Sequence, residues 1–273
     1  MTMDLARCVV GEPISPARSP GFRIRVLGPV SVKTVDSYQE IPGRKTRMVL
    51  AALVIGANRV VAADRLIDAL WREEPPPSAS ATLQAHVSKL RRVLGEDAII
   101  HRAGGYGLRV SCEQIDACRF ERLLLDAEAA IVRDSSHAHA LCRRALDLWR
   151  GRPFGDLADE EFVYLEVRRL EDLRLSAEGL AYEAEIEDGS VAEAVAALRS
   201  AVVEHPYHER LWYLLTEGLA REGRRAEALK AFARYTAIVA EAGMQPDGRM
   251  EALAEAIRTG DAAVYSDLDD PMR

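Results

Sequence analysis

Residues 78–94, SASATLQAHVSKLRRVL, restrict what this chain can fold into more than any other segment. Their large apolar side chains recur at spacings of four, three and four residues, which predicts an amphipathic helix with one buried stripe: Leu83, Val87, Leu90 and Leu94. Because an α-helix turns by about 100° per residue, the opposite face is left exposed. That face carries Ala81, Ala85, Ser88 and Arg92, flanked by Thr82, Gln84, Lys89 and Arg91.

The chemistry of this exposed face suits a nucleic acid. Small side chains permit close approach, while amides, hydroxyls and cations form hydrogen bonds with base edges and phosphates. A basic helix face is also often no more than a solvated surface. The elements on either side of the helix therefore decide between the two interpretations.

Two further helices are predicted before it, over residues 44–57 and 63–71. The three prolines at 75–77 prevent the second helix from continuing, and either Ser78 or Ser80 can cap the third. The alternation in FRIRVLGPVSVKT, residues 22–34, predicts an antiparallel hairpin ahead of all three helices.

A second hairpin follows the basic helix. AIIHRAGGYGLRV, residues 98–110, indicates a strand, a glycine turn at Gly104 and Gly105, and a second strand, with Arg102 and Arg109 near the tip. An arginine in such a position can enter a minor groove. Three helices followed by this hairpin predict a winged helix that binds double-stranded DNA. Tyr106 either packs against the third helix or contacts the DNA.

The charge distribution indicates that the chain has two parts with different binding partners. The 273-residue chain has a net charge of −7, but residues 21–110 hold 14 Lys and Arg against 8 Asp and Glu, and residues 111–273 hold 20 against 33. A cationic part is attracted to phosphate, while an acidic part meets protein. Chance variation of surface charge is the alternative, but the change in sign coincides with the change in sequence pattern.

Residues beyond 111 show helical periodicity almost throughout, and one stretch repeats. A tetratricopeptide-like spacing is predicted from Trp212, Leu215, Leu219, Ala228 and Phe232, and a degenerate copy 34 residues earlier from Ala181, Ala194, Leu198 and Ala201, with Pro206 at its close. Residues 119–150 predict another helix pair. The alternative is an unrelated helical bundle.

The expected fold is therefore mainly α, with an N-terminal α+β winged helix followed by an all-α domain of tetratricopeptide-like repeats. The expected domains are a disordered tail at 1–20, the winged helix at 21–110, the helical repeats at 111–262 and a flexible tail at 263–273.

No signature of an enzyme, metal site or cofactor site is recognised. GRKT at 43–46 lacks the spacing of a phosphate-binding loop, and the histidines lack metal-ligand spacing. The carboxylates at 159–161 are interpreted as a solvated helix start. The cysteines at 8, 112, 118 and 142 form no CxxC pair and are interpreted as reduced thiols. We expect a cytoplasmic protein, because no apolar run has the length of a signal peptide core or a membrane span.

Three stretches carry a family resemblance. NRVVAADRLIDALW, ATLQAHVSKLRRVLG and IIHRAGGYGLRV resemble the effector domain of OmpR-type response regulators. From FRIRVLGPV through ALDLWRGRPFGDL to HPYHERLWYLLTEGLAREGRRAEALKAFARYTAIV, the chain resembles the Streptomyces antibiotic regulatory protein family, over Phe22 to about Asp261. The 32 Arg against 4 Lys suit a GC-rich actinobacterial genome.

The resemblance implies an OmpR-type winged helix joined to a bacterial transcriptional activation domain. It implies tandem binding to promoter direct repeats and recruitment of RNA polymerase holoenzyme, including its sigma factor. By motif position, Gln84, Ala85 and Lys89 would face bases, and His86, Ser88, Arg91 and Arg92 would approach phosphates. Receiver, ATPase and sensor modules of larger relatives have no counterpart in the sequence.

We therefore expect a sequence-specific transcriptional activator of antibiotic or other secondary-metabolite genes, dimeric on promoter DNA, without cofactor or metal. The DNA-binding residues are expected to be Thr82, Gln84, Ala85, His86, Ser88, Lys89, Arg91, Arg92, Arg102, Gly104, Gly105 and Arg109. The alternative is a protein-interaction adaptor that uses the helical repeats and keeps the winged helix as a scaffold.

Overall fold

The structure is a computed structural model that describes residues 12–15, 21–33, 37–72, 74–102 and 104–260. The predicted C-terminal tail, Cys8 and most of the predicted N-terminal tail lie outside these residues. Two compact units make up the chain. The first unit contains residues 1–123 and 144–174, and the second contains residues 124–143 and 175–273.

The first unit opens with a three-stranded antiparallel sheet of order β1-β2-β3. Its strands are β1 (Arg23–Arg25), β2 (Ser31–Lys33) and β3 (Tyr38–Glu40). In the register, Ile24 lies opposite Val32, and both side chains are buried. The predicted N-terminal hairpin is therefore confirmed, and β3 extends it to a third strand.

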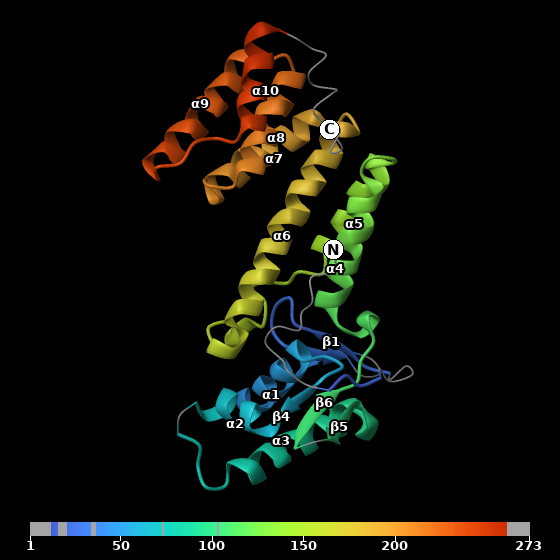
Figure 1. The fold of residues 1–273 in the computed structure, drawn as a ribbon. Helices are drawn as coiled ribbons and strands as arrows, with labels where there is room; N and C mark the ends of the chain where they lie inside the picture. Colours follow the sequence, from blue (N-terminus) through green and yellow to red (C-terminus); the bar gives the residue numbers. More distant parts are fainter. Residues whose placement is uncertain (1–11, 16–20, 34–36, 73, 103, 261–273) are drawn as a thin grey trace. The chain divides into compact units, whose positions relative to one another are not determined.

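A winged helix follows, as predicted (Figure 1). Its elements are α1 (Arg44–Ile55), β4 (Val60–Ala62), α2 (Ala63–Trp71), α3 (Ala79–Leu94), the 3₁₀ helix η2 (Glu96–Ala98), β5 (Ile99–Arg102) and β6 (Gly105–Leu108). The strands form an antiparallel sheet of order β4-β6-β5, in which the β5–β6 hairpin is the wing. The mainly helical fold class with an N-terminal winged helix is thus confirmed.

The stripe predicted for α3 holds this helix against the rest of the winged helix. Leu83, Val87, Leu90 and Leu94 are all buried, with exposed fractions of 6% or less. Leu50 and Leu53 of α1 are fully buried as well, and α3 packs on α1 and α2. Burial of each such side chain contributes about 1.5–3 kcal/mol, so the orientation of α3 about its axis is fixed by its sequence.

Residues 12–15 correct one part of the predicted disordered tail. The amide of Ile14 donates to the carbonyl oxygen of Asn58 at 2.9 Å, and the amide of Val60 donates to the carbonyl oxygen of Glu12 at 3.1 Å. The Ile14 side chain is 6% exposed. These residues add a short extended segment beside β4, because two backbone hydrogen bonds and one buried side chain hold them there.

A short segment, residues 111–118, leads from the wing into α4 (Asp116–Ala130) and contains the 3₁₀ helix η3 (Cys112–Gln114). We call it the connector. Ser111 and Gln114 form a capping box at its start. Both carboxylate oxygens of buried Asp116 accept backbone hydrogen bonds, from the amides of Val26 at 2.7 Å and Leu27 at 3.2 Å.

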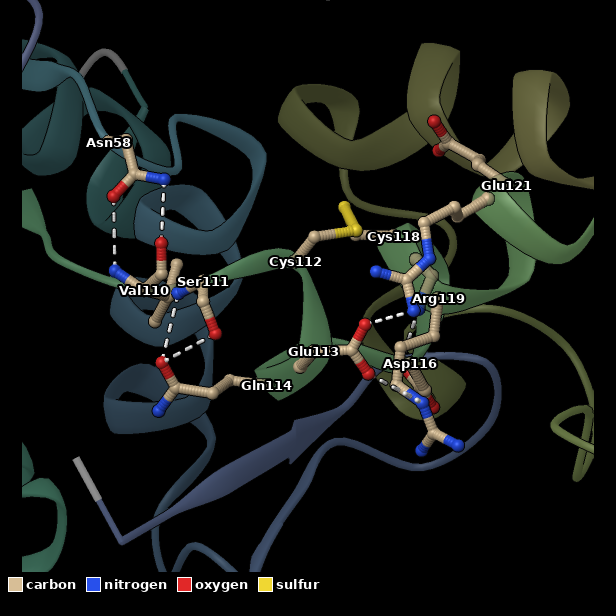
Figure 2. The surroundings of a disulfide bond; sticks show 12 residues. Asn58, Val110, Ser111, Cys112, Glu113, Gln114, Asp116, Cys118, Arg119 and Glu121 are labelled. Carbon is tan, nitrogen blue, oxygen red and sulfur yellow. Dashed lines mark hydrogen bonds and ion pairs between the residues drawn. A yellow bond between two sulfur atoms is a disulfide. The ribbon is translucent and has the colours of Figure 1, made fainter. Parts of the chain in front are cut away.

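The connector also corrects the expectation of reduced thiols. Cys112 and Cys118 form a disulfide (Figure 2). The turn of η3 and the start of α4 bring their Cα atoms to 5.2 Å, within the range that a disulfide requires. Cys142 is a free, buried cysteine, as expected.

The start of α6 (Glu161–Glu187) is tied to the winged helix within the first unit. The guanidinium of Arg44 lies 2.6 Å from Glu160 and that of Arg47 lies 2.6 Å from Asp156. The Glu160 side chain is only 14% exposed, so the interpretation of residues 159–161 as a solvated helix start is wrong for this residue. An ion pair between residues so far apart in sequence has no local signal.

In the described residues of the second unit, all regular secondary structure is helical. Parts of α4, α5 (Ser135–Leu146) and α6 belong to it, together with α7 (Val191–Glu204), α8 (Glu209–Arg221), α9 (Arg225–Glu241) and α10 (Gly248–Thr259). Figure 1 shows α7 to α10 as a layer of neighbouring helices. In α8 every residue from Leu211 to Leu219 is buried, since α7, α9 and α10 all pack on it.

The tetratricopeptide-like anchors lie where the repeat predicts them. Trp212, Leu215, Leu219 and Ala228 are buried between α8 and α9, and Phe232 packs at the edge of the same core. The anchors of the degenerate copy, Ala181, Ala194, Leu198 and Ala201, are buried too. The indole Nε1 of Trp212 donates to the carbonyl oxygen of Pro206 at 2.9 Å, which fixes the chain where the first copy closes.

Candidate nucleic-acid interface

The largest group of predicted site residues that the structure brings together lies on the exposed side of α3, which we call its open face. Burial of the leucine and valine stripe turns the other side of the helix outward. Gln84, Ala85, Ser88, Lys89 and Arg92 are all exposed. Thr82 is half-buried, and its hydroxyl donates to the carbonyl oxygen of Ser78, the N-cap residue, at 3.0 Å. Five of the predicted residues thus share one accessible surface.

His86 is oriented toward α1 rather than outward. Its ring Nδ1 lies 2.9 Å from the hydroxyl Oγ1 of Thr46, and Thr46 is 1% exposed. Burial lowers the pKa of His86 below its usual value, and the positive charges of Lys89 and Lys45 lower it further. The phosphate contact implied for His86 is therefore not supported, and the ring instead fixes α3 against α1.

Arg91 and Arg109 also have partners within the first unit. The Nε of Arg91 donates to the carbonyl oxygen of Ile99 at the start of β5, at 3.0 Å. The Nε of Arg109 donates to the carbonyl oxygen of Ser15 at 3.1 Å. Both side chains are half-buried. They position the wing and the N-terminal segment, so they are weaker candidates for phosphate contacts than Arg92 and Arg102, which are exposed.

The two glycines of the wing have different environments. Gly104 is exposed, has a φ of +73° and has open space around the position of a Cβ. Gly105 is buried, and a Cβ there would lie 2.3 Å from the carbonyl oxygen of Val61 in β4. Gly105 is therefore required for close strand packing and is covered, whereas Gly104 is accessible at the tip. Tyr106 is 7% exposed, which identifies it as part of the core.

Sequence reasoning did not include Lys45 among the site residues. This residue lies in the first turn of α1, and its charge acts on His86 together with that of Lys89. Its ammonium group lies 4.2 Å from the centre of the Trp71 ring. Lys45 thus adds a cation beside α3. Lys45 lies at the start of the helix predicted over residues 44–57, and nothing local in the sequence indicates that this turn lies near α3.

Other chemistry has no comparable cluster in the part of the chain that is described. Among those residues no group of three or more His, Cys, Asp or Glu side chains is arranged to hold a metal ion. Nor does any described helix combine the length and apolar character needed to cross a bilayer.

Two protein-family models match the chain. Residues 42–110 match the family described as "Transcriptional regulatory protein, C terminal", and residues 115–258 match the "Bacterial transcriptional activator domain". The first match covers the winged helix, and the second begins inside the connector. Both families consist of transcriptional regulators rather than enzymes, in agreement with the sequence expectation.

Individual proteins match over most of the chain. Regulatory protein DnrI of Streptomyces peucetius is 33% identical over 89% of this chain and 94% of its own length. Regulatory protein AfsR of Streptomyces griseus is 33% identical over 95% of this chain, but the chain spans only 27% of AfsR.

A solved structure also matches. It is that of Mycobacterium tuberculosis EmbR in complex with a low affinity phosphopeptide, with a TM-score of 0.84 and 31% identity over 89% of this chain and 66% of that chain. The fold, the two family matches and the near full-length similarity to DnrI agree. The chain therefore belongs to the Streptomyces antibiotic regulatory protein family, which joins an OmpR-type winged helix to a bacterial transcriptional activator domain.

Proposed function

We propose that this protein is a sequence-specific DNA-binding transcriptional activator that docks α3 in a major groove. The observation that carries this proposal is the open face of α3, where Gln84, Ala85, Ser88, Lys89 and Arg92 are exposed together. Amide and lysine side chains can read base edges, and arginines neutralise phosphates. The wing contributes Arg102 and the turn at Gly104, which are accessible.

The roles within this surface follow from exposure and from family position. Gln84, Ala85 and Lys89 face bases, while Ser88 and Arg92 contact phosphates. Lys45 is added as a phosphate contact because it lies near Lys89 and His86. His86, Arg91, Gly105 and Arg109 act by holding α3 and the wing in place.

The acidic helical part, residues 111–262, recruits RNA polymerase holoenzyme by contacting its core or its sigma factor. Two protomers bind side by side on promoter direct repeats, so that both lie on one face of the duplex. The controlled genes encode an antibiotic or another secondary metabolite, and the protein acts in the cytoplasm of an actinobacterium. Support comes from the activator-domain match over 115–258 and from the near full-length similarity to Regulatory protein DnrI of Streptomyces peucetius.

One observation favours the adaptor alternative. A groove of about 700 Å³ runs along α8 in the second unit, where Arg210, Tyr213, Leu214 and Glu217 contribute to its wall. A concave surface of stacked helices suits a peptide. The adaptor has no need for duplex affinity, so DNA binding distinguishes the two proposals.

The test is footprinting on promoter fragments that flank the encoding gene, with and without RNA polymerase holoenzyme. We expect two protected half-sites whose centres are about 10–10.5 bp apart or a multiple of that spacing, and extended protection when polymerase is added. Lys89→Ala should reduce this protection, and Lys230→Ala on α9 is its matched control, since both are exposed helical lysines. If the cleavage pattern of the promoter DNA were the same with and without the protein, the proposal would be contradicted.

A further inference from the structure

The connector places two sulfur atoms at the point where the winged helix ends and α4 begins. Cys112 lies in η3 and Cys118 lies in the first turn of α4. Figure 2 shows the pair among the polar side chains of the same segment. With five residues between them in sequence and 5.2 Å between their Cα atoms, the two cysteines meet without displacement of the surrounding backbone.

The residues between these cysteines hold the connector to the rest of the first unit. The amide nitrogen Nε2 of Gln114 donates to the carbonyl oxygen of Phe22 at 3.0 Å. Asp116 accepts from the amides of Val26 and Leu27, and its Oδ2 lies 3.0 Å from Nη2 of Arg150. The disulfide therefore closes a loop that contains the main attachments of the connector.

The two sulfurs differ from the buried thiol in the same chain. Cys112 and Cys118 are half-buried, so a small reagent can reach this segment, whereas Cys142 is fully buried. Burial also raises the pKa of Cys142 to about 11, which keeps that thiol protonated and unreactive at neutral pH. The chain thus contains its own internal control for thiol reactivity.

We propose that Cys112 and Cys118 form a reversible redox site that exchanges with low-molecular-weight disulfides such as oxidised glutathione. In the reduced protein both residues are thiols. One thiol loses its proton and its sulfur attacks the small disulfide, which forms a mixed disulfide and releases one small thiol. The second cysteine then attacks the protein sulfur of that bond and releases the other small thiol.

The overall exchange is balanced. The two cysteines lose two electrons and two protons and form one S–S bond, and the small disulfide gains them and becomes two thiols. An excess of small thiol reverses the exchange. Disulfides in reducing compartments are usually transient, which agrees with the cytoplasmic location proposed above.

The sulfur of Cys118 makes the first attack, on the small disulfide. It lies in the first turn of α4, where the helix dipole favours a negatively charged sulfur. The neighbouring guanidinium groups of Arg119 and Arg122 both pair with Glu113, on the Cys112 side of the connector. Cys112 is the resolving residue, held close by the capping box of Ser111 and Gln114.

The redox state sets how firmly the connector is held. Oxidation adds a covalent bond between η3 and α4, whereas reduction leaves noncovalent contacts, among them the hydrogen bonds of Gln114 and Asp116 and the ion pairs of Glu113. Backbone amides that bond to Asp116, those of Val26 and Leu27, are then expected to exchange with solvent faster. None of these residues belongs to the open face of α3, so the inference does not depend on the identity of the DNA.

The test uses the purified full chain, reduced and then incubated with a rising ratio of oxidised to reduced glutathione. After acid quenching, unfolding and alkylation with N-ethylmaleimide, trypsin releases residues 110–119, VSCEQIDACR, as one peptide with both cysteines. Mass spectrometry then counts alkyl groups on this peptide. Cys142 is read in residues 134–143, DSSHAHALCR.

We expect peptide 110–119 to pass from two alkyl groups to none as the ratio rises, without a populated state carrying one. Reduced glutathione should restore both groups in the folded protein. The Cys142 peptide should stay fully alkylated. Cys112→Ser should trap glutathione on Cys118, and this adduct should form faster than the one on Cys112 in Cys118→Ser.

Two results would overturn the proposal. The first is that Cys112 and Cys118 stay reduced at every ratio of oxidised to reduced glutathione at which Cys142 also stays reduced. The second is that the disulfide, once formed, resists reduced glutathione until the chain is unfolded, which would make it a permanent cross-link.

The effect on the connector has its own test. Amide exchange of Val26 and Leu27 that is equal in the two redox states would contradict it. These readouts contain no DNA, so they are separate from the test of the proposed function.

Discussion

The ring Nδ1 of His86 lies 2.9 Å from the hydroxyl of Thr46, and this contact joins the proposed recognition helix α3 to α1. Thr46 is buried, while His86 lies next to the exposed positions Ala85 and Lys89. The interaction therefore fixes the helix from its buried side and leaves the opposite side open. The account of DNA binding depends on this orientation.

Stability should depend on pH through His86. Its pKa in the folded chain lies below the usual value of about 6.5 in an unfolded chain, so between these two values the unfolded chain binds more protons. The free energy of unfolding should fall as the pH is lowered from 7 through this window. Urea unfolding at pH 7 and 5.5 should show a smaller fall for His86→Gln than for the wild type. An identical pH dependence in the two proteins would exclude this role of His86.

Thr46→Val, which removes the hydroxyl and keeps the shape, should lower the free energy of unfolding by about 0.5–1.5 kcal/mol at pH 7.

The two glycines of the wing should respond differently to alanine. Gly104→Ala introduces a side chain at a φ of +73° but meets open space, so it should cost about 1 kcal/mol of stability. Gly105→Ala must displace the backbone of β4 and should cost about 3 kcal/mol. Thermal and urea unfolding of the two variants measure the difference. If Gly104→Ala were the more damaging change, the described strand packing would be incorrect.

Reduction of the disulfide should destabilise the first unit. A cross-link over six residues restricts the unfolded chain, and its loss should lower the free energy of unfolding by about 2 kcal/mol. Unfolding is compared with and without reductant. Cys142→Ser is a poor control because that residue is buried, so the reductant is tested on the double variant Cys112→Ser/Cys118→Ser. A reductant effect that persists in this double variant would assign the loss to another part of the chain.

Two neighbouring cations on α3 should affect DNA binding in different ways. Lys89→Ala should weaken binding to the specific duplex by about 1–3 kcal/mol and reduce the preference over a scrambled duplex. Arg92→Ala should weaken binding to both duplexes by a similar amount, because a phosphate contact carries no sequence information. Fluorescence anisotropy on the two duplexes measures both, with Arg143→Ala as the control for an exposed helical arginine. Equal losses for Lys89→Ala and Arg92→Ala on both duplexes would rule out the division of roles.

The sequence predicted the elements that repeat with a regular period. The stripe from Leu83 to Leu94 specified both the helix and its buried side, and the spacing from Trp212 to Phe232 specified the α8–α9 pair. Each of these signals is local, because residues three or four apart in a helix share one face. The exposed residues of α3 followed directly from the buried ones.

Most of the features that the sequence did not predict depend on partners far apart in the chain, and the disulfide depends on a local turn. Glu160 is covered because Arg44 reaches it from α1, and Arg109 is held by the carbonyl oxygen of Ser15. The Cys112–Cys118 bond requires the turn of η3, which no CxxC spacing signals. The burial of Glu160 and Arg109 therefore could not be judged from the residues next to them in sequence.

The salt dependence of duplex affinity tests the central proposal most directly. The logarithm of the association constant should fall linearly with the logarithm of salt concentration, with a slope of about −0.9 for each phosphate contacted. Arg92→Ala should make the slope shallower by about 0.9, and Lys230→Ala on α9 should leave it unchanged. An affinity that is independent of salt, or a slope that is the same in Arg92→Ala and the wild type, would contradict the binding of DNA by the open face of α3.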